Sequence, residues 1–327
     1  MKTIIIKFGG SSLSNPGRIR RAAAMVLQER RRGLRPVAVV SAPADSTDDL
    51  LKLAALAGGE KRSARETDAL LAAGEQFSAA LMAMALEAEG ARAVSLTGAQ
   101  AGIRTNSSFG AAEVLRADVR RLRRELAAGR IPVVAGFQGV SAAGDTTTLG
   151  RGGSDLTAVV LAGALRSELC EFRTDVKGVY TAHPAIVPDA RKLEQISYAG
   201  LIALAELGAE VRQLRAVKYA AKRGIRLHLR SSFHDEPGTL VTAGAPAGPS
   251  CLSLKRAGGN ALVSLVGSGL SRELQAEALA AAKAAGLRAS AAGRGARYLT
   301  LKTPAGSGES LLRALHELFF SGQGAHH

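Results

Sequence analysis

The sequence predicts an α/β protein whose mostly parallel sheet is covered by helices on both faces, followed by a smaller α+β domain. Short apolar runs rich in β-branched residues alternate with longer helical patterns over about the first 230 residues, as in sheets built from strand–helix–strand units. After a stretch rich in Gly and Pro, the order changes to strand, helix, strand, strand, helix. A chain of 327 residues is long enough for two such domains.

Apolar runs in the first part are expected to be strands that are buried on both faces. The runs are residues 3–8, 36–41, 93–96, 132–137 and 168–174. They are short and rich in apolar residues, which is typical of central strands in a parallel sheet. Ligands of such sheets bind at the carboxyl ends of the strands, so we expect the functional residues directly after these runs.

Helix start and stop signals lie between the runs. Asn15 followed by Pro16 places an N-cap and a proline at the first helical position before an Arg-rich helix, which Gly33 ends. Two further helices are expected to end at Gly90 and Gly129. Strand and helix signals therefore alternate in the order that a doubly covered sheet requires.

The C-terminal part is expected to form a ferredoxin-like domain. Its predicted strands cover residues 261–266, 288–292 and 297–302, and its predicted helices cover residues 271–285 and 310–320. A ferredoxin-like domain needs one more strand, and residues 251–255 are a candidate for that edge. We therefore expect a first domain over residues 1–240, a linker with the candidate edge strand over 241–258, and a small domain over 259–327.

The charge balance favours an anionic partner without identifying it. Lys and Arg exceed Asp and Glu by 15, which suits nucleic acid, membrane surfaces, nucleotides or acidic metabolites. Trp is absent and aromatic residues make up 4%, so stacking platforms for nucleic-acid bases are scarce. We expect the Arg-rich helices to be solvated faces, and no nucleic-acid partner is predicted.

Neither a membrane span nor a disulfide framework is expected. The longest uncharged stretch, residues 237–254, is interrupted by several Pro and Gly residues and cannot cross a bilayer as a helix. The two cysteines, Cys170 and Cys251, are 81 positions apart, which provides no paired ligands for zinc. A reducing cytoplasm is the expected location.

The first candidate site follows the first predicted strand, where Lys7-Phe8-Gly9-Gly10-Ser11-Ser12 precedes a helix. Two glycines let the backbone approach an anion closely, the serines add hydroxyl donors, and Lys7 adds a positive charge for a phosphate. A Gly-Gly turn after a strand is common for purely structural reasons, so this segment alone leaves both readings open.

The second candidate site is the loop over residues 146–155, which ends in Gly150-Arg151-Gly152-Gly153-Ser154-Asp155 and opens a helix at Ser154. Its glycines and the positive helix terminus suit an anion. Arg151 can bind a carboxylate through two parallel hydrogen bonds, and Asp155 can hold an ammonium or a metal ion. The alternative, an N-cap Ser with an acidic first turn, explains Ser154 and Asp155 but leaves Arg151 unexplained.

A third candidate segment, Thr174 to Tyr180, lies where another buried strand is expected to end. A turn would explain Lys177-Gly178. An aromatic ring and a carboxylate near a strand terminus also suit a nucleotide. Both interpretations stay open for this segment taken alone.

Together these segments resemble the signature blocks of the aspartokinases, in the order and spacing of that family. The matching blocks are residues 7–12, 136–139, 148–155, 174–184, 186–190, 229–232 and 237–239. The resemblance covers about the first 240 residues and implies the three-layer αβα sandwich of the amino-acid kinases. It also implies transfer of the ATP γ-phosphoryl group to the side-chain carboxylate of L-aspartate, giving 4-phospho-L-aspartate, the first step toward lysine, threonine and methionine.

Matched position by position, the resemblance assigns the roles of the site residues. Lys7 and Asp155 are implied to be catalytic, with Lys7 bridging the transferring phosphoryl group. The residues implied to bind aspartate are Ser41, Thr47, Glu75, Arg151, Gly152, Gly153 and Ser154. The residues implied to bind the nucleotide, besides Lys7, are Gly9, Gly10, Ser11, Thr174, Asp175 and Tyr180. ATP and Mg²⁺ are the implied cofactors; Mg²⁺ is expected to arrive with ATP, and Glu75 and Asp155 suit either it or the ammonium.

The chain departs from the family pattern mainly on the nucleotide side. His183 and Ala185 replace an acidic and a basic residue, Glu210 stands where a Lys is usual, and Gln76 replaces a common Arg. A carboxylate near the polyphosphate opposes its binding. The alternative prediction is therefore a weak or catalytically silent relative that binds an amino acid or partners an active kinase.

The C-terminal domain resembles an ACT domain, the small regulatory module that follows the kinase domain in aspartokinases. The family usually carries two such domains, of which this chain has room for one. Paired ACT domains form dimer interfaces in the family and bind feedback amino acids. A homodimer through this domain is expected, because an incomplete sheet edge is generally covered by a partner.

Overall fold

The computed structural model describes residues 2–208, 214–244 and 246–321, and the chain divides into two compact units. The first unit contains Met1–Lys177 and Lys218–Pro237, and the second contains Gly178–Val217 and Gly238–His327. Residues 178–217 thus group with the C-terminal segment. The domain boundary near residue 240 stays a prediction about sequence modules, and each compact unit is described by itself below.

The first unit is built on a parallel sheet. Its strands are β1 (Thr3–Phe8), β2 (Arg35–Val40), β3 (Ala93–Leu96), β6 (Ile131–Ala135), β9 (Leu169–Thr174) and β11 (Arg226–Ser231). They lie in the order β11-β9-β1-β2-β6-β3, and every pair of neighbours is parallel. The apolar runs predicted as strands end within two residues of these boundaries. Their carboxyl ends meet at one edge of the sheet, which is where the predicted site residues lie.

Helices of the first unit lie on both faces of this sheet. The helices that contact the sheet are α1 (Pro16–Arg31), α3 (Ala64–Ala88), α4 (Arg120–Ala127) and α5 (Gly153–Leu165), and α2 (Ser46–Gly58) packs against α3. The predicted cap of α1 is confirmed, because the Asn15 side chain accepts a hydrogen bond of 3.0 Å from the Arg18 amide and Pro16 is the first helical residue. The glycines predicted to end helices, Gly33, Gly90 and Gly129, all have positive φ angles after α1, α3 and α4.

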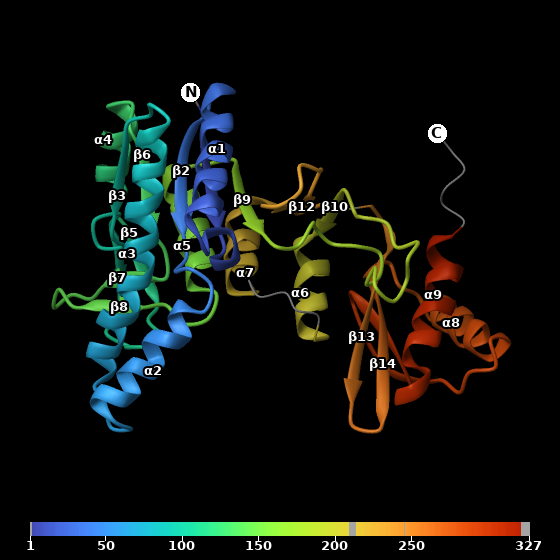
Figure 1. Cartoon of the computed structure of the whole chain (residues 1–327). Helices are drawn as coiled ribbons and strands as arrows, with labels where there is room; N and C mark the ends of the chain where they lie inside the picture. Colours follow the sequence, from blue (N-terminus) through green and yellow to red (C-terminus); the bar gives the residue numbers. More distant parts are fainter. Residues whose placement is uncertain (1, 209–213, 245, 322–327) are drawn as a thin grey trace. The chain divides into compact units, whose positions relative to one another are not determined.

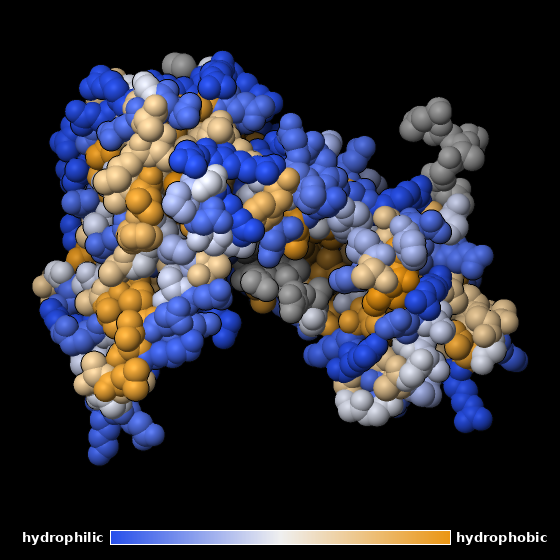
Figure 2. All heavy atoms as spheres, in the orientation of Figure 1, coloured by the Kyte–Doolittle hydropathy of each residue, from blue (hydrophilic) through white to orange (hydrophobic). Residues whose placement is uncertain are grey.

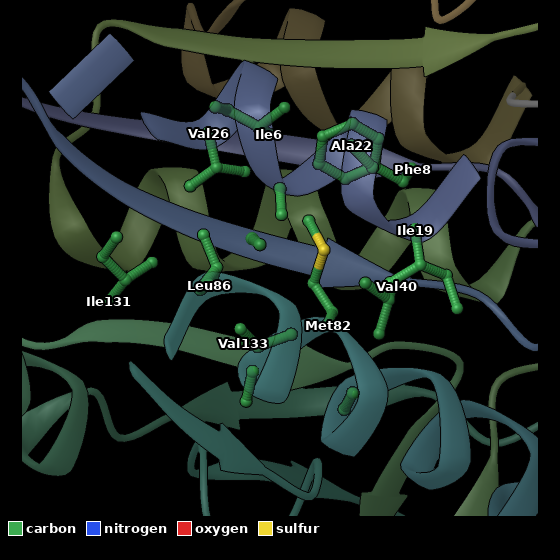
Figure 3. Packing of buried hydrophobic residues seen from close by; sticks show 14 of the residues in the cluster. Ile6, Phe8, Ile19, Ala22, Val26, Val40, Met82, Leu86, Ile131 and Val133 are labelled. Carbon is green, nitrogen blue, oxygen red and sulfur yellow. The ribbon is translucent and has the colours of Figure 1, made fainter. Parts of the chain in front are cut away.

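Alternate strand residues pack against opposite helices. Ile6, Phe8 and Val40 belong to a cluster with Val26 of α1 and Met82 of α3 (Figure 3). The residues between them point to the other face, where α5 packs against β1, β2 and β9. These three layers, seen in Figure 1, confirm the predicted αβα sandwich. Burial on both faces explains why β1, β2 and β6 consist mainly of apolar residues.

A small second sheet in the first unit was not predicted. It contains β5 (Val114–Ala117), β4 (Ile103–Thr105), β7 (Gln138–Val140) and β8 (Thr146–Thr148), in that order. Strands of three or four residues are too short for an alternating pattern to stand out from the surrounding loops. The sheet matters for the site, because β8 leads directly into the loop that carries Arg151.

The second unit contains an antiparallel sheet with two long helices. Its strands are β13 (Gly248–Ala257), β14 (Asn260–Ser268), β15 (Ser290–Gly295) and β16 (Tyr298–Pro304), and its helices are α8 (Arg272–Ala284) and α9 (Gly308–Phe320). The order is β13-β14-β16-β15. Residues 251–255 lie within β13, which pairs antiparallel with β14 at the edge of the sheet. The expected ferredoxin-like fold is therefore present, with its edge strand supplied from the stretch that precedes β14.

The remaining elements of the second unit precede this sheet along the chain. β10 (Gln195–Ser197) pairs parallel with β12 (Thr239–Thr242), and α6 (Tyr198–Glu206) follows β10. α7 (Leu214–Arg223) begins in the second unit and ends in the first. Ala182 and Val187, from the segment before β10, belong to the apolar core formed by the antiparallel sheet and its helices.

One helix of the described chain, α3, is long and apolar enough to span a membrane by length and composition alone. Half of its apolar window is buried inside the protein, and Met82 and Leu86 lie in the core of the first unit. Phe77 and Met84 of α3 are exposed. Figure 2 shows hydrophobic residues at the surface of the protein. The helix is thus a core helix with one apolar solvent-facing side.

Candidate active site

A buried ion pair joins the first strand to the helix after the glycine-rich loop. Lys7 Nζ at the end of β1 lies 2.6 Å from Asp155 Oδ1 in the first turn of α5, and both side chains are less than 10% exposed. The contact is an ion pair rather than a well-aligned hydrogen bond, since Oδ1 has no hydrogen-bond partner among the described residues. An ammonium carries three N–H donors, so Lys7 can still donate to a bound anion.

Glu75 of α3 adds a second buried carboxylate to this edge of the sheet. Its Oε1 accepts a hydrogen bond of 3.0 Å from the Ala42 amide, whereas Oε2 has no partner among the described residues. Burial raises the pKa of the Glu75 carboxyl to about 7, opposed by the Ala42 hydrogen bond and by the positive charge of Lys7. A buried oxygen without a partner is costly unless a ligand binds it, so Glu75 is suited to a cationic group.

The segment after β1 forms a tight backbone cradle. Gly9 donates its amide to the Arg173 carbonyl at 3.1 Å, and the Gly10 carbonyl accepts from the Ala44 amide at 3.1 Å. A Cβ on Gly10 would lie 2.7 Å from the Ala42 carbonyl oxygen, so only glycine fits there. Ser11 is half-buried at the start of a short 3-10 helix (Gly10–Leu13). The glycines therefore serve close packing against the segment after β2.

The loop before α5 brings backbone amides to the same edge. Gly152 has φ +68° and caps α5, while Gly153 and Ser154 are buried in its first turn. A Cβ on Gly136, directly after β6, would lie 2.7 Å from Cβ of Ser154. The N-terminus of α5 thus packs against the end of β6. Arg151 stands exposed on this loop, four residues before Asp155.

Two predicted aspartate-site residues follow β2. The Ser41 amide donates to the Phe8 carbonyl at 3.2 Å, which places Ser41 beside the segment after β1. Thr47 lies in the first turn of α2 and is half-buried. The segment between them holds Ala42, whose amide binds Glu75. The structure therefore brings Ser41 and Glu75 to the edge that carries Lys7 and Asp155.

The nucleotide-side residues fall in both units. Thr174 ends β9; its carbonyl accepts from the Ser232 amide at 2.8 Å and its hydroxyl accepts from the Val176 amide at 3.2 Å. Asp175 is exposed directly after it. Tyr180 belongs to the second unit, where Lys192 Nζ lies 5.9 Å from the centre of its ring. Thr174 and Asp175 therefore join the candidate site of the first unit, and Tyr180 is described within the second.

Of the positions that depart from the family pattern, Gln76 lies on α3 of the first unit, where its Nε2 donates to Gln138 Oε1 at 3.1 Å, whereas His183 and Ala185 lie in the second unit. His183 and Ala185 are exposed, and the Ala185 amide donates to Nδ1 of His183 at 3.2 Å. Glu210 lies outside the described residues. The segment of His183 is anchored to the C-terminal helices, because the Thr181 hydroxyl is hydrogen-bonded to Nε2 of His316 on α9 at 2.9 Å.

Two buried charged residues beside the site were missed by the sequence analysis. Arg173 of β9 pairs with Glu171 at 2.5 Å and donates to the Ser231 carbonyl at 3.2 Å. Asp68 of α3 accepts from the Thr148 amide and hydroxyl, both at 2.7 Å. A charged residue on the buried face of an apolar helix or strand is the signal that could have identified them.

The arrangement can bind an anion beside a cation. Lys7 and the amides at the α5 N-terminus favour negative charge, while Glu75 and Asp155 favour an ammonium or a metal ion. Among residues 2–208, 214–244 and 246–321, no group of three or more His, Cys, Asp or Glu forms a metal site. A divalent cation at this site would thus need oxygen ligands from a bound substrate as well as from Glu75 and Asp155.

Curated relatives of this chain are aspartokinases. The aspartokinase of Mycolicibacterium smegmatis is 48% identical over 242 residues, which are 74% of this chain and 57% of that protein. The aspartokinase of Corynebacterium glutamicum gives the same identity and the same coverage. The chain thus spans a little over half the length of the curated relatives it matches.

Solved structures share the fold. Escherichia coli aspartokinase III in complex with aspartate and ADP matches with a TM-score of 0.80 at 23% identity, covering 98% of this chain and 100% of that chain. Aspartate kinase from Synechocystis matches with a TM-score of 0.67 at 28% identity, covering 97% of this chain and 69% of that chain. The family model described as "Amino acid kinase family" matches residues 2–231, most of the chain, and the protein therefore belongs to the amino acid kinase family.

Proposed function

We propose that the protein is an aspartate kinase that transfers the γ-phosphoryl group of ATP to the side-chain carboxylate of L-aspartate, giving 4-phospho-L-aspartate. The buried pair of Lys7 and Asp155 carries this proposal, because it sets a cation for phosphate and a carboxylate at the same edge of the sheet, 2.6 Å apart. The 48% identity to an aspartokinase supports the choice of aspartate as the acceptor. The product would enter the route to lysine, threonine and methionine.

In the proposed mechanism, aspartate binds between the loop that carries Arg151 and helix α3. Arg151 binds one substrate carboxylate through parallel hydrogen bonds. Glu75 Oε2, which has no hydrogen-bond partner in the described part of the chain, accepts from the substrate ammonium. Ser41, Thr47 and the first turn of α5, with Gly152, Gly153 and Ser154, surround the rest of the molecule. The reacting carboxylate is already ionised at neutral pH, so no general base is needed.

Lys7 and the cradle after β1 act on the phosphate. Gly9, Gly10 and Ser11 surround the transferring group, and Lys7 lies over the negative charge that develops in the transition state. Thr174 and Asp175 of the first unit are proposed to contact the nucleotide, and the nucleotide role of Tyr180 stays a prediction from the family resemblance. Catalysis then depends on positioning and electrostatics rather than on covalent chemistry by the protein.

Mg²⁺ fits the carboxylates of this site. Bound with ATP, it would supply positive charge that offsets the charge of the phosphate groups. Asp155 is the proposed protein ligand, because Lys7 holds its Oδ1 and a carboxylate has a second oxygen that can bind a metal ion. Glu75 is left for the substrate ammonium, since its carboxylate is fixed on one side by the Ala42 amide.

The proposal extends to assembly and location. We propose a homodimer through the C-terminal unit, whose sheet ends in the exposed edge strand β15; an exposed edge is commonly covered by a partner strand. A cytoplasmic location is proposed because both cysteines are free and buried, as suits a reducing compartment.

A second candidate is a relative that binds aspartate with little or no phosphoryl transfer. The observation that favours it is the segment around His183, where the exposed residues His183 and Ala185 provide neither the acidic nor the basic side chain usual in the family. This candidate predicts aspartate binding without ADP release.

Trapping with hydroxylamine tests the proposal, because acyl phosphates react with it to give hydroxamates, which form coloured complexes with ferric iron. The purified protein is incubated with MgATP and aspartate, with glutamate and other carboxylic amino acids as parallel substrates, and ADP release is measured alongside. Hydroxamate that depends on aspartate and equals the ADP released supports the kinase. Calorimetry that shows aspartate binding, with neither hydroxamate nor ADP formed, supports the second candidate. If aspartate does not bind and neither product forms, both proposals are contradicted.

A further inference from the structure

Asp68 is the most densely hydrogen-bonded buried carboxylate of the first unit. It is 1% exposed and lies in the second turn of α3. The Thr148 amide and hydroxyl donate to its two oxygens, both at 2.7 Å, and the Gly110 amide donates to Oδ1 at 3.0 Å and to Oδ2 at 2.9 Å. All these contacts come from donors, which is the environment that a carboxylate requires when it is buried.

Both elements held by Asp68 carry residues proposed to bind aspartate. Glu75 follows Asp68 by seven residues on α3, which is about two helical turns and the same helix face. Thr148 ends β8 and precedes Arg151 by three residues. Asp68 therefore fixes the start of the Arg151 loop relative to the helix that presents Glu75.

We propose that Asp68 is a positioning residue for the amino-acid half of the site. It does not touch substrate. It sets the spacing between Arg151, which binds a substrate carboxylate, and Glu75, which binds the ammonium. This inference rests on the proposed function. Lys7 and Gly9 belong to β1 and its loop rather than to the elements tied by Asp68, so the ATP side should be affected much less.

The chain offers a matched control between the same two elements. Arg65 Nε of α3 donates to Asp145 Oδ1 at 2.7 Å, and Asp145 directly precedes β8. This second tie is at the surface, because the Arg65 side chain is 53% exposed. A solvent-exposed ion pair contributes little to structure. Removing the Arg65–Asp145 pair therefore tests whether the loss of any contact between α3 and the β8 region affects aspartate binding, or only the loss of the buried contact made by Asp68.

The experiment compares wild type with Asp68→Asn, Thr148→Val and Asp145→Asn in the full chain. Titration calorimetry measures the Kd of aspartate and of MgATP separately, steady-state kinetics gives both KM values, and thermal unfolding gives Tm. Asp68→Asn should raise the Kd and KM for aspartate about tenfold or more, since small displacements of positioning groups have large effects. The values for MgATP should stay within about twofold. Thr148→Val removes only the hydroxyl contact, so it should also raise the Kd and KM for aspartate, but by a smaller factor than Asp68→Asn.

The control and the failure modes are distinct. Asp145→Asn should leave all four constants at wild-type values. A lower Tm for Asp68→Asn with unchanged KM values, or equal increases for both substrates, would show a purely structural role and overturn the inference. If Asp68→Asn does not fold, an unchanged aspartate KM in Thr148→Val would overturn the inference instead. Wild-type protein that binds no aspartate contradicts the proposed function itself, which is a different result.

Discussion

The ammonium of Lys7 lies 2.6 Å from the carboxylate of Asp155 inside the protein, with side-chain exposures of 8% and 7%. The two residues are 148 positions apart in the sequence, and they meet because β1 and α5 pack against each other. Two charges buried together stabilise each other only while both are present. This pair is therefore both a structural tie and, in the proposed function, the centre of the chemistry.

Lys7→Met is expected to lose activity and stability together. The change leaves the buried Asp155 charge without its partner, which typically costs about 3–5 kcal/mol of unfolding free energy. Chemical denaturation measures this loss. The double variant Lys7→Met/Asp155→Asn should recover most of it, and Lys2→Met, which breaks the exposed pair with Glu168, should cost less than about 1 kcal/mol. Equal losses for Lys7→Met and Lys2→Met would contradict the prediction.

Glu75 should make the protein less stable as the pH rises. Burial raises the pKa of its carboxyl from 4.5 in the unfolded chain to about 7. Between these two values the folded protein binds more protons than the unfolded chain, so the unfolding free energy falls by at most about 3 kcal/mol across this window. Urea denaturation at pH 4.5, 6 and 8 should show this fall in wild type relative to Glu75→Gln; parallel curves would refute it.

The same titration should control aspartate binding. The ionised carboxylate of Glu75 is the form proposed to hold the substrate ammonium, so the Kd of aspartate should fall as the pH rises through about 7. Calorimetry at pH 6, 7 and 8 measures this dependence. In Glu75→Gln the binding should be weaker and nearly independent of pH in this range, and a wild-type slope retained in that variant would assign the titration to another group.

Arg151→Lys should impair substrate binding without destabilising the fold. Arg151 is exposed, and Lys keeps the charge but loses the two parallel hydrogen bonds that a guanidinium gives a carboxylate. The aspartate KM should rise about tenfold or more, while Tm stays at the wild-type value. Arg166→Lys, at the other end of α5, is the control with both quantities unchanged. An unaltered aspartate KM in Arg151→Lys would remove Arg151 from the site.

Gly10→Ala and Gly9→Ala should differ although the residues are neighbours. A Cβ on Gly10 would lie 2.7 Å from the Ala42 carbonyl oxygen, whereas one on Gly9 would meet its neighbours at 3.8 Å, an ordinary contact distance. Gly10→Ala should therefore cost about 1–3 kcal/mol and displace the Ala42 segment that holds Glu75. Gly9→Ala should cost less than about 1 kcal/mol. Chemical denaturation of both variants measures the two unfolding free energies. Equal values would show that the backbone around Gly10 can move to accept a Cβ atom.

The strands and their order along the chain could be predicted because their signals are local. Strands in the middle of a parallel sheet are rich in apolar residues. The boundaries of β1 and β3 coincide with the predicted runs, and the run predicted for β9 begins one residue early. The capping chemistry of Asn15 and Pro16 is local in the same way. The small sheet with β8 was missed, because its pairing depends on segments distant in sequence and its strands are too short to show a period.

The sequence by itself determined the fold class, the candidate residues after each strand and the resemblance of those segments to aspartokinases. Only the tertiary structure decided that Lys7 faces Asp155, that one oxygen of Glu75 is left without a partner among the described residues, and that Asp68 holds Thr148. The physical reason is one of range. Apolar periodicity and capping act between neighbours along the chain, whereas burial and the pairing of charges depend on residues that only folding brings together.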